Sequence, residues 1–443
     1  MSDAAGDVGR MTAEFLSAVG VRQTLAVLLP VRLAADPPCE ADPADPTDPA
    51  AGSPWRKGPL PFAVAGRVSD TAARRRLFTP AAARALYDRR WHRVMSLTRG
   101  ALRVDGLELL RTPSAKSPRQ ALAIVHFTLT GEPLLPLLRS ISHRRGSALD
   151  PLSGAFDPAE LLAGVANPAP AQSPFALARP YTVAFLTPGT GPSAALRDPS
   201  TGELPAGADW LLRSLAARAA PDDLPLAPEV VAEVRGQARR ISADWSALVL
   251  RQGAAFLGHR TDTGSGDFYD FAALNARCTY LDALLLGTAQ RDHIEELTDD
   301  LSAVFEGPGL ARRVAALEQR IALFRSTYWR QHLDAHGPAN DILLAFQARH
   351  RLPERFSQVL AEAADYARLV QTQESQQIAG ALGVLTVLGL PLGTALSVLQ
   401  VLGDSDPWHL ALALTASLAV TAAALTTRYG RLVLSSLRGG RRR

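Results

Sequence analysis

Histidines and carboxylates offer two places in this sequence where metal chemistry could be done. His332 and His336 stand four residues apart with Asp334 between them, a spacing at which one helix face can hold a zinc or nickel ion. They lie just before the Gly-Pro pair at 337–338, where cationic side chains also stabilise a helix C-terminus. The acidic run EELTDDL from Glu295 could hold a regulatory cation, but it is also typical of an exposed helical face. We therefore expect no bound metal.

Motifs for nucleophilic or nucleotide chemistry are missing from the sequence. TPGTGPS from Thr187 and TDTGSGD from Thr261 are rich in glycine, but neither continues into Gly-Lys-Ser/Thr or forms G-x-G-x-x-G, so both are interpreted as loops. There is no G-x-S-x-G elbow and no H-E-x-x-H. Cys278 and His293 lie 15 residues apart on one predicted helix, about four turns, which excludes a Cys/His pair within it. The sequence predicts neither an enzyme nor a cofactor.

Composition limits the classes of protein that remain. A chain of 443 residues with 47% hydrophobic residues can bury a sizeable core in two or three folding units. Cys39 and Cys278 show no metal spacing and are expected to be free thiols in a reducing compartment. The net charge is +4 and the arginines are spread along the chain, so no nucleic-acid partner is expected. Acidic residues precede any apolar stretch at the N-terminus, which argues against a secretory signal.

Residues 1–265 are predicted to form a cytosolic α/β (or α+β) domain, because short apolar runs alternate with helical patterns. The predicted strands begin at Thr24, Ala101, Gln120, Tyr181 and Ser246, the last with a hairpin at Gln252 and Gly253. Helices are predicted over 79–97, capped by Thr79, and from Gly207. A Pro/Asp/Ala-rich loop near 36–58 is expected to be disordered.

Residues 266–377 are predicted to form a region of long stalk helices. One helix is expected over 268–305, before the breaker at 307–309. The next carries a heptad seam that predicts a homo-oligomer with a coiled-coil contact, unless the seam is covered within one chain: Leu310, Val314, Leu317, Ile321, Phe324 and Tyr328. The last helix, after Pro353, passes into the following apolar segment without a break.

Residues 378–430 contain two uncharged apolar runs that predict a hairpin of two transmembrane helices. Ile378 to Leu402 supplies 25 residues without a charge, and Leu410 to Leu425 supplies 16. Arginines follow the second run and continue through the basic tail at 431–443, whereas the turn between the runs has none. The positive-inside rule then predicts a multi-pass protein of the cell inner membrane with both termini cytoplasmic. The alternative is a buried helical hairpin in a soluble core.

Four residues inside this hairpin are candidates for packing or for a pore, and two more form its outer turn. Gly389 and Gly393 form a G-x-x-x-G pair that permits close helix contact. Pro391 frees a backbone carbonyl, and Gln400 is the only amide of the first run. Asp404 and Asp406 form an acidic turn that is predicted to lie outside the membrane.

The order of these parts resembles the CorA-type divalent-cation channels. The closest local similarity is TVLGLPLGTALSVLQVLG from Thr386, which is similar to the first transmembrane helix of that family. The positions that correspond to the family's Gly-Met-Asn signature are Gln400, Val401 and Leu402, so the signature is missing. The resemblance implies the architecture but not magnesium transport.

A second resemblance concerns LAIVHFTLTG from Leu122 and CTYLDALLLGTAQRDHIEELTDDL from Cys278. Both look like actinobacterial proteins of conflict systems that pair a caspase-like peptidase with tetratricopeptide-repeat proteins. This resemblance implies a membrane-anchored component of a conflict or defence system, with a cytosolic sensing or recruiting domain and a transmembrane anchor or effector pore. The alternatives are a divalent-cation channel with an altered filter and a membrane-tethered enzyme.

Overall fold

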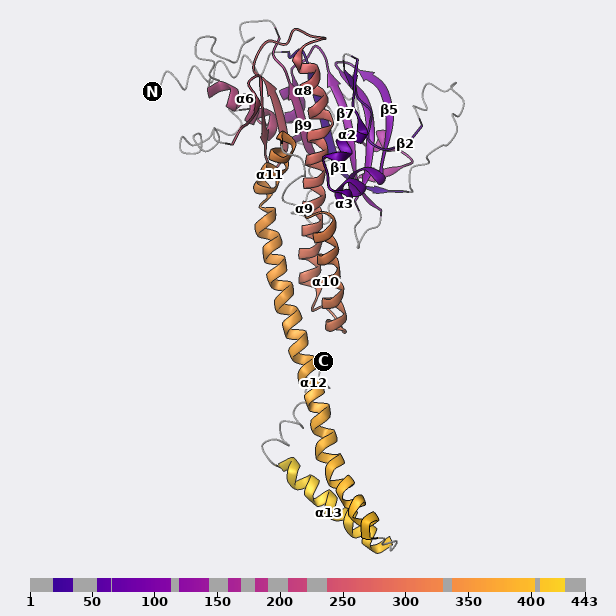
Figure 1. Cartoon of the computed structure of the whole chain (residues 1–443). Helices are drawn as coiled ribbons and strands as arrows, with labels where there is room; N and C mark the ends of the chain where they lie inside the picture. The colour runs from indigo at the N-terminus through magenta and orange to yellow at the C-terminus, as the bar shows by residue number, and fades with distance from the viewer. Residues whose placement is uncertain are drawn as a thin grey trace. The chain divides into compact units, whose positions relative to one another are not determined.

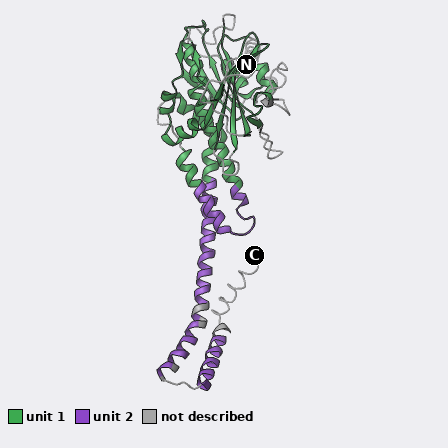
Figure 2. Cartoon of the chain, turned by 90° about the vertical axis from the view of Figure 1, so that its right-hand side faces the viewer, with its two compact units in different colours: residues 1–299, 321–357 green, residues 300–320, 358–443 purple. Residues whose placement is uncertain are grey.

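A computed structural model describes residues 19–34, 54–64, 66–112, 119–142, 158–168, 180–189, 206–220, 237–329, 337–402 and 407–426. The chain divides into two compact units (Figure 2). Unit 1 consists of Met1–Asp299 and Ile321–Ser357, and unit 2 of Asp300–Arg320 and Gln358–Arg443. Residues 266–299 and 321–357 of the predicted helical stalk region fall in unit 1, and residues 300–320 and 358–377 fall in unit 2.

Unit 1 is built on a ten-stranded mixed sheet, so the prediction of a mixed α/β domain is confirmed. The strand order is β10-β11-β12-β9-β1-β7-β6-β5-β2, with β8 also paired to β1. Only β9 and β12 pair in parallel among the described strands. The strands are β1 (Gln23–Leu33), β2 (Arg56–Lys57), β5 (Arg90–Arg99), β6 (Leu102–Arg111), β7 (Gln120–Leu129), β8 (Ala166–Pro168), β9 (Tyr181–Leu186), β10 (Arg239–Ser242), β11 (Trp245–Val249) and β12 (Gly253–Gly258). A separate hairpin joins β3 (Ala63–Val64) to β4 (Arg67–Val68).

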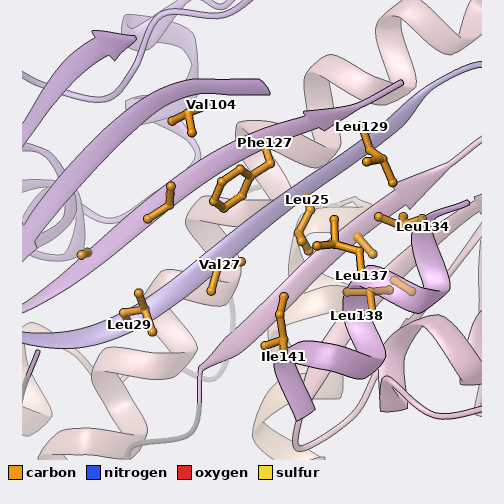
Figure 3. Close-up of a cluster of buried hydrophobic side chains, with 14 of the residues drawn as sticks. Leu25, Val27, Leu29, Val104, Phe127, Leu129, Leu134, Leu137, Leu138 and Ile141 are labelled. Carbon is orange, nitrogen blue, oxygen red and sulfur yellow. The ribbon is translucent and has the colours of Figure 1, made fainter. Parts of the chain in front are cut away.

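Helices cover both faces of this sheet, which explains why its central strands read as nearly continuous apolar runs. On one face, alternate residues of β1, β6 and β7 point toward α4 (Leu134–Ser142) (Figure 3). Leu134, Leu137, Leu138 and Ile141 recur at the helical spacing of three and four, and all are buried in the same cluster. The helix α6 (Ala206–Ala217), predicted from Gly207, adds Leu211, Leu212 and Leu215 to this core.

The predicted strands from Thr24, Ala101, Gln120, Tyr181 and Ser246 are confirmed, and so is the hairpin between β11 and β12. The predicted helix over 79–97 is wrong beyond Asp88. It is divided into α3 (Pro80–Ala83) and a π-helix, η1 (Arg84–Asp88), and the chain then enters strand β5. Pairing with β6, for example Trp91 with Leu109, outweighs the helical pattern of the local sequence.

Two other boundaries differ from those predicted. The helix expected over 268–305 is interrupted at Cys278, which separates α8 (Phe268–Arg277) from α9 (Thr279–Ala303). In the loop expected to be disordered near 36–58, residues 36–53 lie outside the described residues. The end of that loop is ordered, because Trp55 is buried and β2 pairs with β5.

The remaining long helices are α10 (Leu310–Thr327), α11 (Pro338–His350), α12 (Leu352–Leu402) and α13 (Pro407–Thr426). α12 runs for 51 residues without interruption, which confirms the predicted passage from the last stalk helix into the apolar segment. The heptad seam of α10 is buried within the chain at Val314, Leu317, Ile321 and Phe324. The seam therefore needs no second copy, and the homo-oligomer remains a prediction without this support.

Gly287 of α9 sets how closely that helix approaches α11. A Cβ at this position would lie 2.5 Å from Phe346 Cδ1, and Phe346 is itself fixed between Tyr181 and His350. We expect Gly287→Ala to lower the free energy of unfolding by about 1–3 kcal/mol, although alanine is the better helix former. Gly389→Ala is the matched control, because a Cβ there meets nothing within 4 Å. Thermal unfolding that is equal for the two variants would contradict the close contact.

Candidate functional site

The second helix of the C-terminal hairpin in unit 2 buries small side chains. α13 lies beside the end of α12 in both views (Figures 1 and 2). Among the α13 residues whose burial is described, 407–423, the least exposed are Ala413, Ser417 and Thr421, at intervals of four. Ser417 and Thr421 are only 6% and 5% exposed. Small residues at this spacing allow two helix backbones to approach closely.

The large aliphatic side chains of the same hairpin are exposed. Leu390 is 59% exposed on α12, and Leu418 is 58% exposed on α13. The same holds for Ile378, Leu382, Leu396, Val398, Val401, Leu410, Leu412, Leu414 and Val420. Hydroxyl groups inside and leucines outside reverse the arrangement of a water-soluble helical hairpin.

Both runs predicted to cross a membrane are helical. Across the described residues, which leave out several side chains between 384 and 402, no helix is long and apolar enough to traverse a bilayer. The crossing itself therefore remains a prediction.

Of the candidates named from the sequence, Gly389, Gly393 and Gln400 are exposed on α12, and Pro391 is half-buried there. Gly389 and Gly393 are exposed, and a Cβ on either would meet nothing within 4 Å, so this G-x-x-x-G pair packs against no other described part of the chain. Pro391 lies inside α12, where the Thr394 hydroxyl donates to the Leu390 carbonyl at 2.8 Å. Gln400 is exposed. Asp404 and Asp406 lie outside the described residues.

A buried ionic network in unit 1 was not anticipated from the sequence. Asp282, fully buried on α9, accepts hydrogen bonds from Arg74 Nε at 2.9 Å and from Arg90 Nη1 at 2.6 Å. The Tyr87 hydroxyl donates to the same carboxylate at 2.6 Å. These donors come from α2 (Thr71–Arg76), β5 and η1, so one carboxylate joins α9 to three other elements.

The network continues across the sheet through Glu108 of β6 and His126 of β7. Arg90 Nε donates to Glu108 Oε2, and His126 Nε2 lies 2.7 Å from Glu108 Oε1. Burial alone would raise the pKa of Glu108, but the Arg90 guanidinium and the His126 hydrogen bond hold it well below its usual range. Burial lowers the pKa of His126 despite the neighbouring carboxylate. Two arginines and two carboxylates therefore balance in charge beside a neutral imidazole.

A second polar cluster lies where the parallel strands β9 and β12 end, at TDTGSGD, the stretch interpreted as a loop. Arg22 Nε donates to Asp262 Oδ2 at 2.6 Å, and Arg22 Nη1 donates to Asp270. The Thr187 hydroxyl donates to Asp262 at 2.7 Å, and the Gly264 amide donates to the other oxygen at 2.8 Å. The loop is thus held by the Arg22 guanidinium, the Thr187 hydroxyl and its own Gly264 amide.

Arg260 extends this cluster on the far side of the loop. Its Nη2 donates to Asp267 at 2.5 Å, and its guanidinium carbon lies 5.1 Å from the centre of the Tyr269 ring. Hydrogen bonding to Arg260 lowers the pKa of Asp267 below its usual range. Asp267 also caps α8 by accepting from the Tyr269 amide. The feature of the sequence that could have predicted this cluster is a pair of glycines flanked by acidic residues shortly after the end of a strand.

Among the described residues, the other chemical candidates do not assemble into a site. His332, Asp334 and His336 lie outside the described residues. Burial raises the pKa of the Cys278 thiol to about 11, so the thiol is protonated near neutral pH. Within the described ranges, which include the acidic run at Glu295, no group of three or more His, Cys, Asp or Glu side chains could hold a metal ion.

No family model, curated protein or solved structure matches this chain. Its function must therefore be argued from its own residues.

His350 of α11 predicts a pH dependence of stability. Burial, together with Arg291, Arg251 and Arg355, lowers its pKa to about 3. An unfolded chain binds this proton near pH 6.5, so the free energy of unfolding should fall as the pH drops from about 6.5 toward 3, with no change from this group above that window. His350→Phe should flatten the dependence measured by denaturant unfolding over this range. An unchanged slope would contradict this assignment.

Proposed function

We propose that the chain is a membrane-anchored protein in which the α12–α13 hairpin is the anchor and the sheet domain is a cytosolic sensing or recruiting module. The observation that carries the proposal is the inverted hairpin. Its hydroxyl-bearing residues Ser417 and Thr421 are buried, while Leu390, Leu414 and Leu418 are exposed. Water would penalise that surface, whereas lipid tails match it.

The sequence around these residues adds a second argument. Residues 378–402 carry no charged side chain, and 25 helical residues exceed the roughly 20 needed for a hydrocarbon core of about 30 Å. The arginines of the C-terminal tail favour a cytoplasmic end after the second helix. The proposal is therefore a multi-pass inner-membrane protein with both termini cytoplasmic.

The experiment is membrane fractionation of the full chain followed by an alkaline wash. The wild-type chain should stay in the washed membranes. Leu414→Arg/Leu418→Arg should release it, because each exchange costs about 3–4 kcal/mol of insertion free energy near a helix centre. The matched control is Val68→Arg/Leu323→Arg, two exposed apolar positions outside the hairpin. A wild-type chain in the soluble fraction would refute the anchor.

The wider role rests on the resemblance to conflict-system proteins. In that role, the sheet domain recruits a caspase-like peptidase or a tetratricopeptide-repeat protein to the membrane. The test is co-purification of the full chain with such a protein encoded by a neighbouring gene. If both are expressed together and no complex forms, the recruiting role fails while the anchor stands on its own test.

A further inference from the structure

The net positive charge of this protein comes from two segments. Residues 56–89, here called the basic segment, hold eight Arg and Lys against two Asp, and residues 428–443 hold six Arg and no acid. The rest of the chain keeps 33 of its 47 cationic residues but 41 of its 43 acidic residues, a net charge of −8. The view that the arginines are spread along the chain therefore does not hold at the level of individual segments.

The basic segment presents its charges at the surface of unit 1. Only Arg74 of its eight cationic residues is buried, in the network around Asp282. The seven others are exposed: Arg56, Lys57, Arg67, Arg75, Arg76, Arg84 and Arg89. An exposed set of this size over 34 residues creates a local positive potential that the net charge of the chain conceals.

Contacts tie the elements of the basic segment together. Arg75 of α2 pairs with Asp88 of η1 at 2.8 Å, and the Phe78 and Tyr87 rings meet edge to face at 6.2 Å. The Gly58 amide, next to β2, donates to the Arg90 carbonyl at 2.8 Å. α2 and η1 are therefore held together, and β2 is held to β5, the strand that follows η1.

Little acid compensates these cations. Asp88 is used by Arg75, and Asp70 caps α2 by accepting from the Ala72 amide at 2.8 Å. In the described part of the chain, six exposed cations of the segment form no ion pair: Arg56, Lys57, Arg67, Arg76, Arg84 and Arg89. Five of the six are arginines, whose planar guanidinium binds phosphate oxygens in pairs.

We propose that the basic segment is a binding surface for the phosphate backbone of double-stranded nucleic acid, without sequence preference. The aromatic side chains of this region, Trp55, Phe62, Phe78 and Tyr87, are all buried. They cannot stack on the bases of a single strand, as binding to single-stranded nucleic acid requires. Nor can they enter a lipid interface, and Val68 is the only large apolar side chain exposed among the described residues of the segment, whereas surface-binding segments combine cations with several such groups. Backbone contacts to a duplex need only the cations.

The test is fluorescence anisotropy with a labelled 30-base-pair duplex and the full chain in nanodiscs of uncharged lipid. The wild-type chain should bind with a dissociation constant on the order of micromolar at about 0.1 M salt. Arg76→Gln/Arg84→Gln/Arg89→Gln should weaken binding tenfold or more and reduce the salt slope of the logarithm of affinity by about two to three.

Two controls keep the result specific. Arg240→Gln/Arg312→Gln/Arg325→Gln removes the same charge from exposed positions outside the segment and should change affinity less than threefold. Near-identical thermal unfolding of both variants shows that the fold is kept. The proposal is overturned if the wild-type chain does not bind the duplex, or if both variants lose affinity equally. It is also overturned if the segment binds free anionic vesicles and not the duplex.

Discussion

Replacement of Asp282 by alanine should lower the free energy of unfolding by about 3–5 kcal/mol. The Asp282 carboxylate is the shared partner of Arg74 and Arg90, and all three side chains are buried. Without it, two guanidinium groups stay in the interior with only Glu108 to balance them. The Tyr87 hydroxyl loses its acceptor as well, which adds a desolvation penalty.

Denaturant unfolding of Asp282→Ala measures this loss. Asp299→Asn is the matched control, because Asp299 is exposed on the same helix, and its effect should stay within about 0.5 kcal/mol. An Arg74→Met exchange added to Asp282→Ala should recover part of the loss by removing one unpaired charge. If the two single variants are equally stable, the network does not hold α9 against the sheet.

Arg22→Ala should lower the free energy of unfolding by a similar amount, about 3–5 kcal/mol, through the second polar cluster around Asp262 and Asp270. Asp262 and Asp270 are both nearly buried, and Arg22 is the cation between them. Thr187 and the loop amides still donate to these carboxylates, but they supply no compensating charge. The loop should therefore open in the variant before the sheet unfolds.

A double-mutant cycle separates the charge from the packing in this case. Asp270→Asn combined with Arg22→Ala should be less destabilised than the sum of the single variants by about 0.5–3 kcal/mol. Arg32→Ala, at an exposed position of β1, the strand that Arg22 directly precedes, is the control for arginine truncation. Additive effects in the cycle would mean that Arg22 acts through its aliphatic stem alone.

The strands of unit 1 were the most predictable part of the fold. Runs such as QTLAVLLPVRL in β1 are apolar on both faces, as a strand covered on both sides requires. The β5 segment was mistaken for helix because a capped helix does begin at Thr79, where the hydroxyl accepts from the Ala82 amide. Its conversion to a strand depends on β6, a partner that a local pattern does not reveal.

The polar clusters were less accessible to sequence reasoning. Arg74 and Asp282 are 208 positions apart, and Arg22 and Asp262 are 240 apart, so no local spacing links them. The hairpin illustrates the opposite case. Ala413, Ser417 and Thr421 carry a visible four-residue spacing, but the G-x-x-x-G motif instead favours a face of α12 that meets no other part of the described chain.

Labelling from within the bilayer tests the membrane anchor most directly. The full chain in lipid vesicles is treated with a lipid-soluble photoactivated carbene reagent, and the labelled positions are mapped by mass spectrometry. The anchor predicts labelling at Leu382, Leu390, Leu414 and Leu418, which are exposed, with Ser417 and Thr421 protected between the helices. Labelling confined to the sheet domain would contradict the anchor. So would a hairpin that is labelled no more strongly in vesicles than in detergent-free buffer.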